Sequence, residues 1–200
     1  MVSNRGGVAR ILYKEIVPGD LRKIQAESND SETGGGARDF RFGSYKTLLP
    51  VIREMFPETL NERRRRAGRD SAEVFKGKFY WENARGGVEW QDSYFESPTD
   101  ARPSEGRIRR IHQYVCFDTS NIPQGGLGNR VLVLFIQLED SSVWPYFAEE
   151  RTLRQKGMWD SAVATEILAC IDAERGANRA VIGFKDFIDG TRYCNGKLCN

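Results

Sequence analysis

Two arginine-bearing segments, about 65 residues apart, contain the side chains best suited to bind an anionic partner. The first is Glu32–Phe42 (ETGGGARDFRF) and the second is Ser104–His112 (SEGRIRRIH). Glycine allows a backbone N–H to approach a phosphate closely, and a guanidinium group can donate two parallel hydrogen bonds to a phosphate or to a guanine edge. Neither segment contains the groups that a catalytic site needs. The two segments therefore indicate recognition of an anion rather than a reaction.

The first segment combines a hinge with two cations. Gly34–Gly36 can act as the hinge that brings Arg38 and Arg41 to DNA, while a phenylalanine of Phe40–Phe42 is anchored in a sheet. The alternative is a glycine-rich connection whose arginines pair with nearby carboxylates such as Asp39. Both interpretations stay open for this segment.

The second segment alternates in the manner of a strand. Arg107, Arg109 and Ile111 would share one face, so the two guanidinium groups could reach neighbouring bases in a major groove. The alternative is a solvated strand edge protected by charge. Proline and glycine flank the segment and predict that it projects, which favours recognition.

A third basic segment is Arg63–Arg66 together with Arg69. Arg64 and its neighbours could contact phosphates without reading sequence, which would make the affinity salt-dependent. A solvated loop is an equally good interpretation, and Glu58 and Glu62 reduce the local positive field.

Catalytic motifs are missing. No aspartate or glutamate has a lysine two positions later, so the pair that holds Mg²⁺ and assists water in many nucleases is not found. His112 is the single histidine, which excludes paired-histidine hydrolases. Gly190–Lys197 resembles a phosphate-binding loop, but it has one residue too many and Leu198 where Ser or Thr is needed. We predict no catalytic residues, no cofactor and no enzymatic activity.

The four cysteines show no paired CxxC spacing, and a zinc site needs four ligands. We therefore predict no metal, and free thiols in a reducing compartment. No apolar run approaches the roughly 20 residues that cross a bilayer, and the first residues lack a signal-peptide pattern. These observations favour a cytoplasmic protein with no membrane association.

Composition predicts one globular domain over residues 1–200, because 40% of the residues are hydrophobic and 11% aromatic. Residues 38–110 carry 16 Lys/Arg against 12 Asp/Glu, whereas residues 139–176 carry 4 against 8. The middle of the chain is thus a plausible anion-facing side, and the later part a solvent-facing or partner-facing side.

Alternation and turn signals predict strands at 10–17, 39–42, 73–81, 87–90, 107–117, 130–138 and 179–187. Helices are expected after Asp20 and at 45–55, 147–156 and 160–176, with Ser44 and Asp160 as N-caps. Strands dominate and no βαβ unit repeats. The fold class is predicted to be mostly β (α+β): an open pseudobarrel of mixed strands with two or three helices at its ends.

The order of these segments resembles the N-terminal effector-binding domain of EcoRII-type restriction endonucleases, a DNA-binding pseudobarrel of the plant B-three superfamily. The resemblance rests on Asn29–Gly36, Met55–Pro57, Glu105–Arg110 and Leu127–Leu138, and Val143–Trp144 extends it. These short islands are spread over most of residues 10–184.

The resemblance implies two protruding arms that grip the major groove of double-stranded DNA. By position, the first arm consists of Gly35, Gly36, Arg38 and Phe42. The second consists of Glu105, Arg107 and Arg109, with Arg110 beside them. An acidic residue in the second arm suits a cytosine amino group. Where members of the family have a histidine after the paired glycines, this chain has Gly36, which leaves the recognised sequence open.

The leading hypothesis is a recognition module or subunit of a restriction or phage-defence system, with catalysis supplied by a separate nuclease subunit or domain. Two alternatives remain. One is a divergent metal-dependent nuclease that uses scattered acidic residues: Glu73, Glu89, Asp92 and Glu96. The other is a protein-interaction module that uses the acidic segment 139–176.

Overall fold

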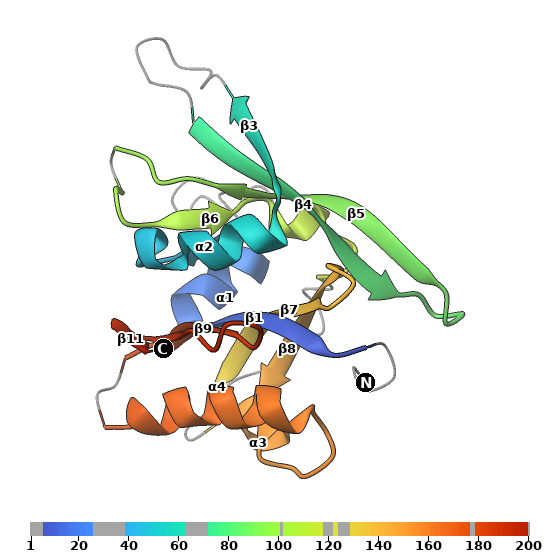
Figure 1. The fold of residues 1–200 in the computed structure, drawn as a ribbon, viewed down its shortest axis with the longest axis vertical. Helices are drawn as coiled ribbons and strands as arrows, with labels where there is room; N and C mark the ends of the chain where they lie inside the picture. Colours follow the sequence, from blue (N-terminus) through green and yellow to red (C-terminus); the bar gives the residue numbers. More distant parts are fainter. Residues whose placement is uncertain are drawn as a thin grey trace.

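A computed structural model describes residues 6–25, 39–62, 72–100, 102–117, 122–123, 129–176 and 179–199. In these residues the chain is mostly β: one long sheet curls into an open half-barrel, and a few helices pack against it (Figure 1). The predicted fold class, a mostly β open pseudobarrel, is confirmed.

The strands in chain order are β1 (Val8–Glu15), β2 (Phe40–Phe42), β3 (Glu58–Glu62), β4 (Ala72–Glu82), β5 (Val88–Glu96), β6 (Gly106–Ile108), β7 (Val131–Leu138), β8 (Val143–Glu149), β9 (Ile182–Asp186), β10 (Arg192–Cys194) and β11 (Lys197–Cys199). In space their order is β11-β10-β9-β1-β7-β8-β4-β5-β6-β2, and β3 pairs with β4. The helices are α1 (Pro18–Gln25), α2 (Tyr45–Met55), α3 (Glu150–Leu153) and α4 (Ser161–Ala173), with a 3-10 turn at Ile111–Gln113.

Strand β7 lies in the middle of the sheet, between β1 and β8, and all eight of its residues are buried. Its apolar sequence explains this position, because a strand covered on both faces has no polar side. Val131, Val133 and Phe135 belong to one core, and the alternate residues from Leu132 to Leu138 belong to the other. The predicted central strand is confirmed.

The two cores lie on opposite faces of the sheet. The first is rich in aromatic rings and includes the buried side of α2, for example Leu48 and Ile52. In it, Phe79 and Phe117 meet edge to face, with ring centroids 5.7 Å apart. The second core packs Val163 and Ile167 of α4 against β7. The first core supports the strands that carry the arginine segments.

Helix α4 begins where the sequence predicts. The carboxylate of Asp160 accepts hydrogen bonds from the N–H groups of Ala162 and Val163, which would otherwise lack partners at the helix start. By contrast, Ser44 does not cap α2: it adopts a left-handed conformation with φ 56°, and its hydroxyl accepts a hydrogen bond from the Tyr193 hydroxyl at 2.7 Å.

Two element predictions are wrong in detail. The helix expected at 147–156 is shorter than predicted, because residues 147–149 belong to β8, which stays paired with β7 as far as Glu149, and α3 covers only Glu150–Leu153. Helix α1 begins at Pro18, a residue suited to a first turn, while Asp20 forms an ion pair with Lys14. Residues 190–197, whose sequence resembles a phosphate-binding loop but does not match one, contain β10 and the start of β11, which form a hairpin.

Two cysteines are joined by a disulfide. Cys170 of α4 and Cys194 of β10 have Cα atoms 5.7 Å apart, within the range that a disulfide requires. The expectation of free thiols is therefore wrong for this pair, because the fold brings together two residues 24 positions apart. Cys116 remains a thiol, and burial raises its pKa to about 12.

Opening this disulfide should lower the free energy of unfolding by about 3 kcal/mol, since the bridge closes a loop of moderate length in the unfolded chain. Urea denaturation with and without reductant measures the difference. The Cys116→Ser variant is the control and should respond to reductant as the wild type does. An unchanged unfolding midpoint after complete reduction would contradict this expectation.

Candidate nucleic-acid interface

The described parts of the two arginine segments, residues 39–42 and 104–112, lie side by side at one end of the sheet. Strand β2 from the first segment pairs antiparallel with β6 from the second, and Arg41 stands directly opposite Arg107. The flanking residues of both strands are buried, while these two arginines are only partly covered. The fold therefore joins two stretches that are far apart in sequence and turns an arginine from each toward the same outer face.

Gly106 fixes how closely these strands approach the core. A Cβ atom at this position would lie 2.4 Å from a ring carbon of Phe95 and 2.8 Å from one of Tyr45. No other residue fits without displacing a ring. Gly106 is therefore needed for close packing. The sequence suggested a different role for glycines in these segments, namely to let the backbone approach a phosphate.

Arg107 is held by two buried carboxylates. Its Nε donates to Glu96 at 2.6 Å, and one terminal nitrogen donates to Asp39 at 3.0 Å. Asp39 is 4% exposed and Glu96 is 6% exposed. Burial alone would lower the pKa of Arg107, but the charges and hydrogen bonds of the two carboxylates raise it above the usual range. Arg107 is thus the counter-ion of an internal acidic pair.

The other arginines at this edge are less tightly held. Arg41 lies 3.6 Å from Glu105 and 3.9 Å from Asp39, both long for an ion pair. Arg102 donates to Glu105 at 3.0 Å, but its side chain is 52% exposed. Their guanidinium groups can exchange these contacts for an external anion at small cost.

Beyond β6 the chain turns instead of continuing as a strand. Arg110 adopts φ 56°, and its N–H donates to the Asp39 carboxylate at 3.2 Å. The 3-10 turn then directs Ile111 into the first core, where it is fully buried. The strand predicted over 107–117 is wrong for this reason: burying Ile111 requires a reversal that a straight strand cannot make. Arg110 itself is exposed.

The charges at this edge do not balance. The arginines are Arg41, Arg102, Arg107, Arg109 and Arg110, and the carboxylates are Asp39, Glu96 and Glu105. Five positive charges against three negative charges leave an excess of two. We call these eight residues the arginine edge. Asp39 and Glu96 are buried beneath it, and the partly covered or exposed arginines give its outer side an excess of positive charge.

Four predicted site residues, Gly35, Gly36, Arg38 and Arg64, fall outside the described residues. Phe42 is fully buried and packs 5.7 Å from Phe95 by ring centroids, so it supports the sheet and offers no surface to a ligand. Arg109 lies 4.0 Å from Glu96 and is partly exposed.

Three members of the edge were missed by the sequence predictions as site residues: Asp39, Glu96 and Arg102. Asp39 was named only as an alternative partner for arginine, and Glu96 only as a scattered acid. Their common role depends on contacts such as that of Arg107 with Asp39, which spans 68 positions. No local pattern in the sequence carries that information.

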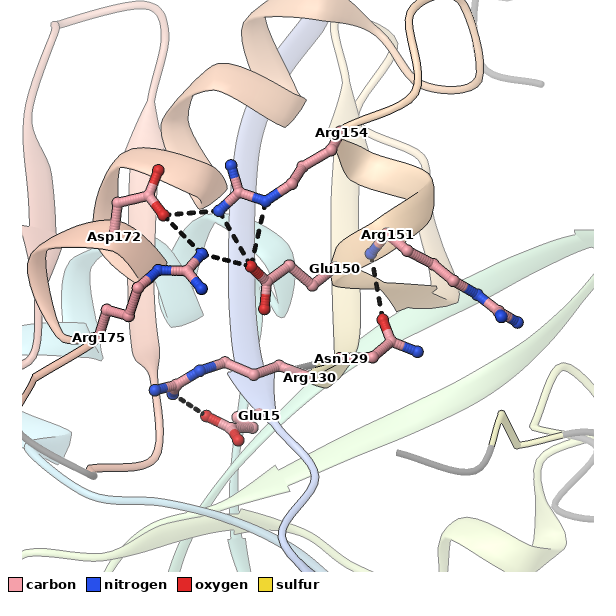
Figure 2. A network of polar contacts seen from close by, with 8 residues as sticks. All are labelled: Glu15, Asn129, Arg130, Glu150, Arg151, Arg154, Asp172 and Arg175. Carbon is pink, nitrogen blue, oxygen red and sulfur yellow. Dashed lines mark hydrogen bonds and ion pairs between the residues drawn. The ribbon is translucent and has the colours of Figure 1, made fainter. Parts of the chain in front are cut away.

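A second charged cluster lies in the acidic part of the chain (Figure 2). One carboxylate oxygen of Glu150 accepts hydrogen bonds from Arg154 at 2.9 Å and from Arg175 at 2.7 Å. Asp172 accepts from the same two arginines, at 2.6 and 2.9 Å. This cluster joins α3 to the end of α4. Glu150 is buried, whereas Asp172 is 50% exposed, and both are paired with arginines of the same chain, which suits a structural role.

The acid stability of the protein should depend on Glu150. Burial alone would raise its pKa, but the hydrogen bonds from Arg154 and Arg175 lower the pKa below its usual range. The pKa of this carboxyl group is roughly 4.3 in the unfolded chain and lower in the folded protein, so the ionised group stabilises the fold at pH values above the unfolded-state pKa. This stabilisation is lost as the pH falls through the pKa of the folded protein. Glu150→Gln should cost about 2 kcal/mol at neutral pH and little at acid pH, as measured by urea denaturation.

The acidic residues considered for a nuclease centre each contact a cation or an amide. Glu73 lies 3.6 Å from Arg53, Asp92 lies 3.2 Å from Lys76, and Glu89 accepts from Asn83 at 2.6 Å. Within the part of the chain that the structure describes, no group of three or more His, Cys, Asp or Glu residues is placed to hold a metal ion.

Comparisons with protein-family models, with curated proteins and with solved structures found no match to this chain. Among the described residues, no helix is both long enough and apolar enough to span a membrane.

Proposed function

We propose that the chain is a double-stranded DNA-recognition module whose contact surface is the arginine edge. The observation that carries this proposal is the pairing of β2 with β6, which puts Arg41 and Arg107 from two distant segments on one face. The excess of arginine over carboxylate supports it, because phosphate contacts supply much of the affinity of DNA-binding proteins.

The roles of the arginines differ. Arg107 pairs with both Asp39 and Glu96 and positions the strand. Arg41, Arg102 and Arg110 have the exposure or the weak ion pairs that allow contact with phosphates or base edges. Arg109, which is partly exposed, is the fourth arginine to which we assign DNA contact. Gly35, Gly36, Arg38 and Arg64, which the sequence indicates for DNA contact, remain predictions outside the described residues.

The biological setting follows from the resemblance to the effector-binding domains of restriction endonucleases. We propose a sequence- or modification-reading subunit or fragment of a cytoplasmic restriction or phage-defence system, with cleavage supplied by another subunit or domain. The chain itself supplies recognition and no catalysis.

The test is a titration of a fluorescent random-sequence duplex, read by anisotropy at several salt concentrations. If four arginines contact phosphates, a plot of the logarithm of the binding constant against the logarithm of the salt concentration should have a slope of about −3 to −4. Selection from a randomised duplex pool, with and without modified cytosine, then identifies the sequence read. No binding at low salt would contradict the proposal.

A further inference from the structure

A cleft of about 670 Å³ lies between α2 and the end of the sheet formed by β9 and β11. Small-molecule sites commonly enclose about 300–1,000 Å³. The cleft contains none of the residues of the arginine edge, so it is a separate feature of the molecule. The residues that line it come from α2, from β1 and from the C-terminal strands and the turn that follows β9.

Part of the cleft lining is apolar: Pro50 and Val51 of α2, Phe184 of β9 and Leu198 of β11. Val51 and Phe184 are buried behind this lining, whereas Pro50 and Leu198 are exposed. Leu198 is 56% exposed although it is a large aliphatic side chain. A lining of this kind accepts a flat apolar group, which would cover the exposed leucine.

The carboxylates of the cleft are largely engaged. Asp186 accepts from Arg10 Nε at 2.6 Å and from the Ile188 N–H at 2.8 Å. Asp189 accepts from the Thr191 N–H at 2.7 Å. Glu54 is the least tightly held, at 3.4 Å from Arg10. Few acidic groups are therefore available to bind a cation.

The cleft lining has three cations, Arg10, Lys46 and Arg53, against the three carboxylates. Arg10 is engaged by Asp186. Lys46 is exposed and has no ion-pair partner among the described residues. Arg53 lies 3.6 Å from Glu73 and stays 58% exposed. Lys46 is therefore the cation of the cleft with most freedom to bind an added anion.

We propose that this cleft binds a small amphipathic anion: a flat apolar body between Pro50 and Leu198, with its carboxylate, sulfonate or phosphate group on Lys46. Glu54 also lines the cleft, near the opposite end of α2 from Lys46 and about 12 Å away along the helix axis, and its negative charge opposes an anionic ligand. Replacing Lys46 and replacing Glu54 should therefore change the affinity for an anion in opposite directions.

The probe is anilinonaphthalene sulfonate, a flat apolar dye with one anionic group, titrated by fluorescence. Lys46→Glu should raise its Kd about tenfold, because an attractive charge becomes repulsive. Leu198→Asp should raise it similarly by removing apolar contact, while Glu54→Gln should lower it about threefold. Thioflavin T, a flat cationic dye, should bind more weakly than the sulfonate dye to the wild-type protein. Its affinity should rise in the Lys46→Glu variant.

The matched control is Trp90→Ser on the β4–β5 hairpin. Trp90 is 53% exposed, lies outside the cleft lining and is a large aromatic surface on which a dye could settle. Its removal should leave the titration unchanged if the cleft is the site. Three results would each overturn the proposal. They are loss of dye binding in Trp90→Ser, an equal response of both dyes to Lys46→Glu, and no saturable binding by the folded wild-type protein. Circular dichroism of each variant verifies folding.

Discussion

Arg107→Ala should destabilise the protein by about 3–5 kcal/mol, because it removes the close cation of two buried carboxylates and leaves them, among the described residues, only the Arg110 N–H and the long contacts of Arg41 and Arg109. Here two carboxylates, Asp39 and Glu96, would be left buried near the core, since both are less than 10% exposed. Urea denaturation of the variant against wild type measures the loss. The effect should appear without any DNA present.

Two further variants separate charge from packing. Arg102→Ala removes a 52% exposed arginine from the same edge and should change stability by less than about 1 kcal/mol. Combining Arg107→Met with Asp39→Asn and Glu96→Gln removes all three charges and should recover most of the loss, because the buried site then contains no unpaired ion. A stable Arg107→Ala protein would contradict the internal role assigned to this residue.

Replacing both Arg41 and Arg110 by alanine should weaken binding to duplex DNA by about 2–6 kcal/mol, since each guanidinium contact is worth about 1–3 kcal/mol. The smaller figure already corresponds to a roughly thirtyfold rise in Kd. Stability should change little, because Arg41 makes only long ion pairs and the backbone hydrogen bond of Arg110 to Asp39 is retained. Anisotropy titration measures the affinity, and the salt slope should fall in magnitude by about two.

Exposed arginines away from the edge provide the control. Arg85 lies at the tip of the β4–β5 hairpin, and Arg151 of α3 is 69% exposed. Alanine at both positions removes the same total charge as the test variant. Equal losses of affinity in the two double variants would indicate attraction to net charge alone and would exclude a localised contact surface.

The elements predicted best are those whose pattern has one physical solution. The apolar run of β7 can only be satisfied in the middle of a sheet, and Asp160 before α4 has the ordinary geometry of a helix cap. Residues 147–149 were misassigned because a short aromatic and apolar run fits either a helix or a strand, and pairing with β7 decides between them.

The candidate site was predictable only in part. The alternation of Phe40–Phe42 indicates a strand with Arg41 on its outer face, which the structure bears out. That Arg41 faces Arg107, and that Asp39 bridges Arg107 and the Arg110 N–H, are long-range facts set by packing. The same limit explains why the disulfide between Cys170 and Cys194 was not foreseen.

The most direct measurement is covalent footprinting of arginine with phenylglyoxal, with and without duplex DNA, read residue by residue by mass spectrometry. If the arginine edge is the contact surface, DNA should protect Arg102 and Arg110 from modification and leave Arg85 and Arg151 as reactive as before. Protection confined to Arg85 or Arg151, or unchanged reactivity of Arg102 and Arg110 at saturating DNA, would contradict the proposed function.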